Sequence, residues 1–93
     1  MKKLTVLYLE GCPYCRNAKA ASEELLKEIP DFSEIQIDWI EERQLASIAN
    51  NYNYYYVPSI FYGTRKLYEC KPGDDFNTIK QQFRTAMESV IDD

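Results

Sequence analysis

The chain has 93 residues, 45% of them hydrophobic, and its 11 basic and 15 acidic side chains give a formal net charge of −4. This length suits one domain with a modest hydrophobic core, and we expect a single domain over residues 1–93. The acidic balance and the scattered lysines and arginines exclude the basic patch of a nucleic-acid binder, and no apolar stretch is long enough for a membrane span, so we expect a monomer that acts on proteins or small thiols.

The first half of the chain predicts two strands that alternate with two helices. The predicted strands cover residues 4–9 and 35–39, and the predicted helices cover residues 13–28 and 42–51. The first strand is a short apolar run that stops before Gly11, which is typical of a buried strand. Apolar residues at helical spacing follow Pro13, and Pro30 closes that helix. We assign Trp39 to the core.

The second half predicts a hairpin and a closing helix. The two strands cover residues 55–62 and 65–70, and the Gly63-Thr64 link between them is typical of a tight turn. The apolar stripe of the final helix consists of Phe76, Ile79, Phe83, Met87 and Val90. We expect Asp74 to cap this helix. The order βαβαββα implies a mixed sheet with helices on both faces, because a parallel crossover needs an intervening helix.

Two cysteines, Cys12 and Cys15, stand where the first strand gives way to the first helix. Unpaired amides and the helix dipole at this place favour a thiolate over a thiol at Cys12. Pro13 suits the first helical position. Cys15 follows about one turn later, so the two thiols can form and open a disulfide. Arg16 and Lys19 are the nearby cations, and they either support the thiolate or belong to a solvated helix face.

The N-terminal residues Met1-Lys2-Lys3 are similar to the start of a signal peptide, but the apolar run behind them covers only residues 4–9 and ends at Glu10. We therefore expect a cytoplasmic protein, in a compartment where thiols are kept reduced. A Cys-x-x-Cys pair in that compartment is more often catalytic or metal-binding than structural.

Three features together resemble the glutaredoxins of the thioredoxin superfamily, over almost the whole chain. They are Cys12-Pro13-Tyr14-Cys15 after the first strand, Val57-Pro58 opening the third strand, and the terminal helix. The resemblance implies an α/β, thioredoxin-like fold with a four-stranded mixed sheet flanked by helices. It also implies that Cys12 is the exposed nucleophile and Cys15 the resolving thiol.

The same resemblance implies where a substrate binds. The substrate-binding positions are Pro13, Tyr14, Val57, Pro58, Gly73 and Asp74. Pro58 is expected to be cis and to face the cysteines, while the backbone of Val57 hydrogen-bonds an extended substrate or glutathione. Tyr14 is expected to stack beside the substrate. Gly73 and Asp74 lie in the segment where glutaredoxins carry a Gly-Gly pair that receives glutathione.

The chain departs from the glutaredoxin pattern at the glutathione contacts. Glutaredoxins usually carry a lysine where this chain has Leu9, and Glu10 adds a negative charge beside it. Lys71 compensates in part for the missing lysine. We predict a dithiol–disulfide oxidoreductase that exchanges with protein disulfides or glutathione mixed disulfides. It holds no bound cofactor, and either glutathione or a thioredoxin-reductase-type enzyme supplies its electrons.

Other interpretations of the cysteine pair remain open. The chain is either a thioredoxin-type protein that works without glutathione, a module that holds partners without turnover, or a cluster-bridged dimer, which Pro13 disfavours. A Cu(I) site is another alternative, because small ferredoxin-like metallochaperones also place Cys-x-x-Cys between a first strand and helix, although they end in a strand. Three cysteines without histidine do not supply the four ligands of structural zinc, so we expect no metal. A structural disulfide closing so short a loop would restrain the unfolded chain little.

Three further observations bear on the site. Cys70 is expected to be a small buried residue of the fourth strand, or else a site of oxidation. The tyrosines near the expected active-site rim are Tyr52, Tyr54, Tyr55 and Tyr56. They serve either strand packing or an aromatic surface that contacts the substrate. The chain has no histidine and no recognisable buried acid near Cys15, so water or a surface group must accept the proton of the resolving thiol.

Overall fold

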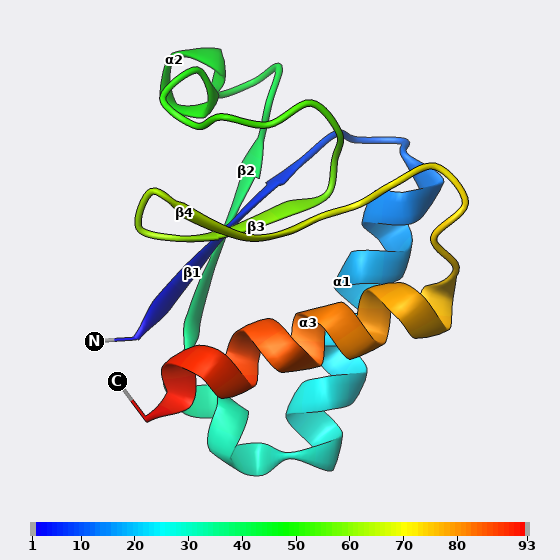
Figure 1. Ribbon diagram of the computed structural model, residues 1–93, viewed down its shortest axis with the longest axis vertical. Coiled ribbons are helices and arrows are strands. Elements are labelled where there is room, and N and C mark those ends of the chain that lie inside the picture. The colour runs from blue at the N-terminus through cyan, green and yellow to red at the C-terminus, as the bar shows by residue number, and fades with distance from the viewer. Residues whose placement is uncertain (1, 93) are drawn as a thin grey trace.

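The computed structural model describes residues 2–92 and consists of one sheet with helices on both sides (Figure 1). The elements in chain order are β1 (Lys3–Tyr8), α1 (Pro13–Glu28), the 3-10 helix η1 (Pro30–Glu34), β2 (Gln36–Glu41), α2 (Ala46–Ala49), β3 (Ser59–Tyr62), β4 (Arg65–Glu69) and α3 (Phe76–Ile91). The predicted order βαβαββα is confirmed, with η1 as an addition. The last element of the described residues is the helix α3, whereas the metallochaperone alternative predicts a strand at that place. Within the described residues, no helix combines the length and apolar character needed to cross a bilayer.

Strand β1 lies inside the sheet, whose strand order is β2-β1-β3-β4. It runs parallel to β2 and antiparallel to β3, and β3 is antiparallel to β4. Leu7 pairs with Ser59 in the register of β1 and β3. The residues that follow β1 and those that precede β3 therefore meet at the same edge of the sheet. This edge brings the segment of Cys12 close to Val57 and Pro58.

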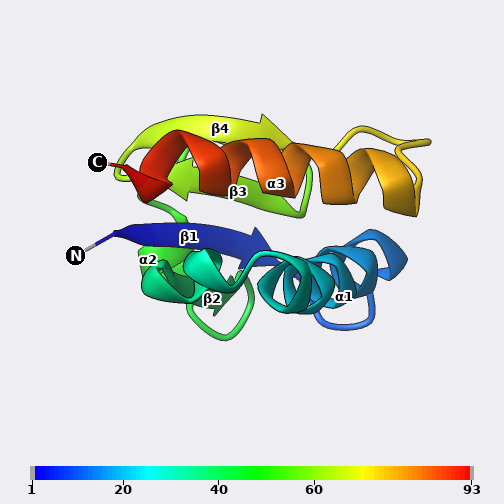
Figure 2. The ribbon, with the colours of Figure 1, turned by 90° about the horizontal axis from the view of Figure 1, so that it is seen from below.

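Both faces of the sheet are covered. Helices α1 and α3 lie side by side on one face, and Figure 2 shows α3 running along β3 and β4. The core on this face includes Val6, Leu25 and Phe83, none of which has exposed surface. The smaller core on the opposite face consists of Leu7, Ile40, Ala49 and Phe61, with Tyr52, Tyr54 and Val57 packed against it. Successive side chains of a strand point to opposite faces, so β1 contributes to both cores.

Helix α1 has the predicted bounds, with Pro13 in its first turn. Its buried residues recur at intervals of three and four and are Cys15, Ala18, Ala21, Ser22 and Leu25. Most of them are small, which lets α3 pack closely against this face. The Ile29 N–H donates to the Leu25 carbonyl at 2.8 Å and ends the helix.

The predicted second helix over residues 42–51 is wrong in length, because α2 covers only Ala46–Ala49. Glu41 accounts for the difference. Its Oε1 accepts the N–H groups of Arg43, at 2.7 Å, and of Gln44, at 3.0 Å. These bonds fix a turn at the end of β2, and the helix begins only after this turn.

Two strand boundaries differ from the prediction in the second half of the chain. The third strand begins at Ser59 rather than at residue 55, because Glu69 Oε2 accepts the N–H groups of Tyr55 and Tyr56 at 2.6 and 2.7 Å and keeps them out of the strand ladder. Strand β4 ends at Glu69, so the predicted range 65–70 is one residue too long and buried Cys70 directly follows the strand.

The predicted cap of α3 is also wrong by one residue. The side chain of Asp75, not Asp74, accepts the Thr78 N–H at 2.8 Å. Asp74 Oδ2 instead accepts the Tyr68 hydroxyl at 2.7 Å. Asp75 therefore caps α3, and Asp74 stabilises the segment that precedes the helix.

Candidate active site at the start of α1

Cys12 is the N-cap residue of α1 and is half-buried. Its extended backbone, with φ −81° and ψ 123°, follows Gly11, whose φ of +88° favours glycine. In the described chain, no side chain caps this helix and its first turn holds no acidic residue. The unpaired amides and the positive end of the helix dipole therefore stabilise negative charge beside the Cys12 sulfur.

Cys15 lies one turn further along α1 and is only 5% exposed. The Leu9 N–H donates to its sulfur at 3.5 Å. Burial raises the pKa of Cys15 to about 12, and Cys12 beside it adds to the rise, against the opposing effect of the Leu9 N–H. Both cysteines are free thiols in this structure. The pair is thus asymmetric: one thiol is accessible, and the other is buried and holds its proton.

The Val57–Pro58 peptide bond is cis, in agreement with the resemblance. The Pro58 carbonyl accepts the Cys70 N–H at 3.0 Å. Cys70 lies near Cys12: burial raises the pKa of its thiol, and Asp74 and Cys12 raise it further. Pro58 and Cys12 therefore share Cys70 as a neighbour. The N–H and carbonyl of Val57 make no backbone hydrogen bond to another described residue.

Tyr14 connects the cysteine motif to the segment before α3. Its hydroxyl oxygen accepts the Gly73 N–H at 2.9 Å. Asp74 Oδ2 accepts the Lys71 N–H at 3.0 Å in addition to the Tyr68 hydroxyl, and these two donors hold the pKa of Asp74 below its usual value. Of the predicted substrate-binding residues, Tyr14 and Gly73 are in direct contact, while the Asp74 carboxylate is engaged within its own segment. Pro13 is exposed at the first turn of α1.

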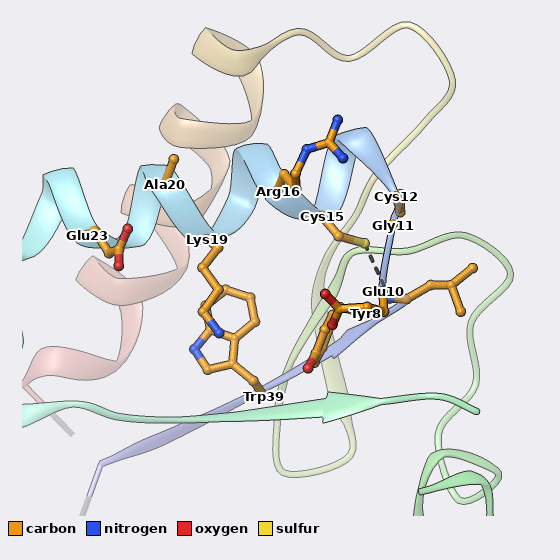
Figure 3. Close-up of a pocket in the computed structure, with 11 residues that line it drawn as sticks. Tyr8, Glu10, Gly11, Cys12, Cys15, Arg16, Lys19, Ala20, Glu23 and Trp39 are labelled. Atoms are coloured by element: carbon orange, nitrogen blue, oxygen red, sulfur yellow. Dashed lines mark hydrogen bonds between the residues drawn. The ribbon is translucent and has the colours of Figure 1, made fainter. Parts of the chain in front are cut away.

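A cavity of about 310 Å³ opens beside the two cysteines (Figure 3). Its lining residues are Tyr8, Leu9, Glu10, Gly11, Cys12, Cys15, Arg16, Lys19, Ala20, Glu23 and Trp39. Lys19 reaches from α1 toward β2, where its Nζ lies 5.0 Å from the centre of the Trp39 ring and 5.9 Å from that of Tyr8. Figure 3 shows the Arg16 side chain pointing away from these rings. The cavity gives water a route to buried Cys15.

The assignment of Trp39 to the core is confirmed in part: its half-buried ring packs against the core beside Phe83 and also forms part of the cavity wall. Sequence reasoning missed the pairing of Lys19 with Trp39. The signal was the four-residue spacing of Cys15 and Lys19, which puts both side chains on one face of α1.

Glu41 is a buried acid, only 2% exposed, that the sequence analysis did not recognise near the cysteines. Its Oε2 accepts the Glu10 N–H at 2.9 Å, and this bond and those from Gln44 and Arg43 hold the pKa of Glu41 below its usual value. Glu10 adjoins Leu9, the donor to Cys15. Glu41 therefore fixes the connection between β1 and α1. Its oxygens are occupied by amides, so it is a positioning residue and does not accept a proton from Cys15.

The described residues contain no group of three or more histidine, cysteine, aspartate or glutamate side chains placed to hold a metal ion. No protein-family model matches the sequence, and no curated protein matches it. Among solved structures, the zinc-bound form of human ERp44 is similar, with a TM-score of 0.61 and 16% sequence identity. The match covers 91% of this chain and 27% of ERp44, so this chain spans about a quarter of that protein. The chain has a thioredoxin-like α/β fold, with a four-stranded mixed sheet flanked by helices.

Proposed function

We propose that the protein is a glutaredoxin-like dithiol–disulfide oxidoreductase in which Cys12 and Cys15 exchange with disulfides of other molecules. The observation that carries this proposal is the asymmetry of the two thiols at the start of α1. Cys12 is accessible beside unpaired helix amides, while Cys15 is buried and holds its proton. The thioredoxin-like fold supports the proposal as the setting of this chemistry.

In the first step, the Cys12 thiolate attacks one sulfur of the substrate disulfide. A bond forms between Cys12 and that sulfur, the substrate S–S bond breaks, and the other substrate sulfur leaves as a thiolate that takes a proton from water. The helix amides favour the attacking thiolate. No histidine is available in the chain to assist, so the start of α1 supplies the activation.

In the second step, Cys15 loses its proton and attacks the Cys12 sulfur. The Cys12–Cys15 disulfide forms, and the second half of the substrate leaves as a thiolate. The raised pKa of Cys15 means that a base must remove its proton. Water in the adjoining cavity, or the departing thiolate itself, serves as this base. Two electrons pass to the substrate, and glutathione or a reductase returns them to the protein.

Substrate binding follows from the groups near the pair. The N–H and carbonyl of Val57, which lack backbone partners in the described chain, are suited to pair with an extended substrate beside Pro58. Two amides that would suit a glutathione carboxylate are already occupied, since Tyr14 accepts the Gly73 N–H and Asp74 accepts the Lys71 N–H. These contacts favour protein disulfides over glutathione adducts as substrates. The proposed place of action is a reducing compartment such as the cytoplasm.

A coupled assay tests the proposal. The protein is given a protein disulfide or a glutathione mixed disulfide, with either glutathione or a thioredoxin-reductase system as the electron source. We expect turnover of the protein disulfide, and we expect Cys12→Ser to abolish it. Cys15→Ser should retain only reactions that need a single thiol. Full activity of Cys12→Ser, or no reduction of either substrate by the unaltered chain, would refute the proposed function.

A further inference from the structure

Two tyrosines before Val57 are exposed to an unusual degree for large aromatic side chains. Tyr55 is 89% exposed and Tyr56 is 53% exposed. Their backbone is nevertheless fixed, because Glu69 Oε2 accepts both of their N–H groups and Glu69 Oε1 accepts a bond from Lys66 at 2.7 Å. The rings are therefore displayed to solvent on a backbone that is already ordered.

The two tyrosines border a groove of about 640 Å³, which we call the tyrosine groove. Its lining residues are Tyr55, Tyr56, Leu67, Tyr68, Glu69, Lys71, Pro72, Asp74, Thr78 and Gln82. They come from the segment before β3, from β4 and the residues after it, and from the start of α3. Aromatic rings, Leu67 and Pro72 give the groove an apolar surface that a polypeptide side chain can cover.

The tyrosine groove adjoins the proposed active site on two sides. On one side, Tyr56 is directly followed by Val57, whose backbone groups have no backbone partner among the described residues. On the other side, Pro72 and Asp74 flank Gly73, whose N–H donates to Tyr14 of the cysteine motif. A chain that pairs with Val57 therefore continues into the groove.

We propose that the tyrosine groove binds the polypeptide next to the reacting cysteine of a disulfide-bonded protein substrate. This inference rests on the proposed function. An extended chain advances about 3.3 Å per residue, so a partner paired with Val57 reaches Tyr55 within about two residues. Tyrosine rings on a fixed backbone give contact area at low entropic cost. The preferred partner carries an apolar or aromatic residue at that distance from its cysteine.

The charged residues that line the groove are Glu69, Lys71 and Asp74. Glu69 is paired with Lys66, and the Asp74 carboxylate accepts two hydrogen bonds within its own segment. Lys71 is exposed and makes no ion pair with another described residue. The charge of Lys71 also lowers the pKa of Asp74, so these two opposite charges of the lining offset each other and the apolar side chains set the preference of the groove.

The test compares a protein disulfide with bis(2-hydroxyethyl) disulfide, which reacts with Cys12 and leaves the groove empty. In the double variant Tyr55→Ser/Tyr56→Ser, we expect KM for the protein disulfide to rise about tenfold, as for the loss of aromatic anchors at an interface. The rate with the small disulfide should stay within about twofold of the original, because truncation of exposed rings leaves the thiols in place. The matched control is Leu45→Ser/Ile48→Ser, which removes two exposed apolar side chains near α2 and should change neither rate.

A second measurement uses two peptides that differ only in one residue, Phe or Ser, two positions from a cysteine held in a mixed disulfide. The Phe peptide should react faster with the original protein, and the difference should disappear in Tyr55→Ser/Tyr56→Ser. An unchanged KM for the protein disulfide, or equal loss with both disulfides, would overturn the groove proposal while the proposed function stands. Failure of the unaltered chain to reduce either disulfide would defeat both proposals.

Discussion

The Tyr14→Phe substitution isolates one contact between the cysteine motif and the segment before α3. It keeps the aromatic ring and removes the hydroxyl oxygen that accepts the Gly73 N–H at 2.9 Å. The freed amide then becomes available to a carboxylate of glutathione. We therefore expect Tyr14→Phe to shift the preference of the protein toward glutathione mixed disulfides.

The size of this shift follows from the bond that is lost. A neutral hydrogen bond contributes about 0.5–1.5 kcal/mol net, and this one lies near the surface, so about 1 kcal/mol is a reasonable value. A glutathione carboxylate no longer has to displace the tyrosine hydroxyl, and about 1 kcal/mol corresponds to about a fivefold gain in kcat/KM. The loss of this hydrogen bond should also lower Tm by about 4–8 °C in a domain of this size.

The assay measures kcat/KM for a peptide–glutathione mixed disulfide and for a protein disulfide, together with thermal unfolding. Tyr52→Phe is the matched control, because Tyr52 packs against the smaller core and its hydroxyl makes no hydrogen bond to another described residue. It should change neither the ratio of the two substrates nor Tm. If Tyr14→Phe left that ratio unchanged, the Gly73 amide would have no part in discriminating against glutathione.

Three other predictions follow from burial and titration. Phe83→Ala should lower the free energy of unfolding in urea by about 3–5 kcal/mol, whereas exposed Gln81→Ala should leave it nearly unchanged. The Glu10 N–H and other amides hold the pKa of Glu41 below its usual value of 4.5, so its contribution to stability is present above pH 4.5 and is lost as pH falls further. In Glu41→Gln, the free energy of unfolding should fall less steeply as the pH is lowered below 4.5 than it does in the original protein. An unchanged pH dependence would contradict this. Cys15→Ser should accumulate a mixed disulfide detectable by mass spectrometry; rapid release would show that another group resolves it.

Much of the fold follows from local signals in the sequence. Apolar periodicity and Pro13 give the bounds of α1 correctly, and the glycine-containing link at Gly63 gives the β3–β4 hairpin. Two of the errors occur where a side-chain carboxylate competes with local propensity. Glu41 shortens α2 by binding amides two and three residues further on, and Glu69 delays β3 by binding amides 13 and 14 residues away. The contacts of Glu69 depend on the folded arrangement, which local propensity does not encode.

The candidate site shows the same division. The spacing of Cys12 and Cys15 and their place at a helix start are readable from the sequence, because both depend on local geometry. The wall of the neighbouring cavity cannot be read from the sequence. Trp39 lies on the edge strand β2, so the burial of its ring depends on which residues cover that edge. Alternation correctly puts Trp39 on the core face of β2, but it does not show that Lys19 lies over the exposed part of the ring.

The most direct test of the account is the rate of alkylation of each cysteine at neutral pH, measured on the folded and on the urea-unfolded chain with iodoacetamide and peptide mass spectrometry. We predict that Cys12 reacts before Cys15 in the folded chain, and faster there than in the unfolded chain. Cys15 should stay unmodified at neutral pH until the chain unfolds. Equal alkylation rates of Cys12 in both states, or earlier modification of Cys15, would contradict the claim that the start of α1 activates Cys12.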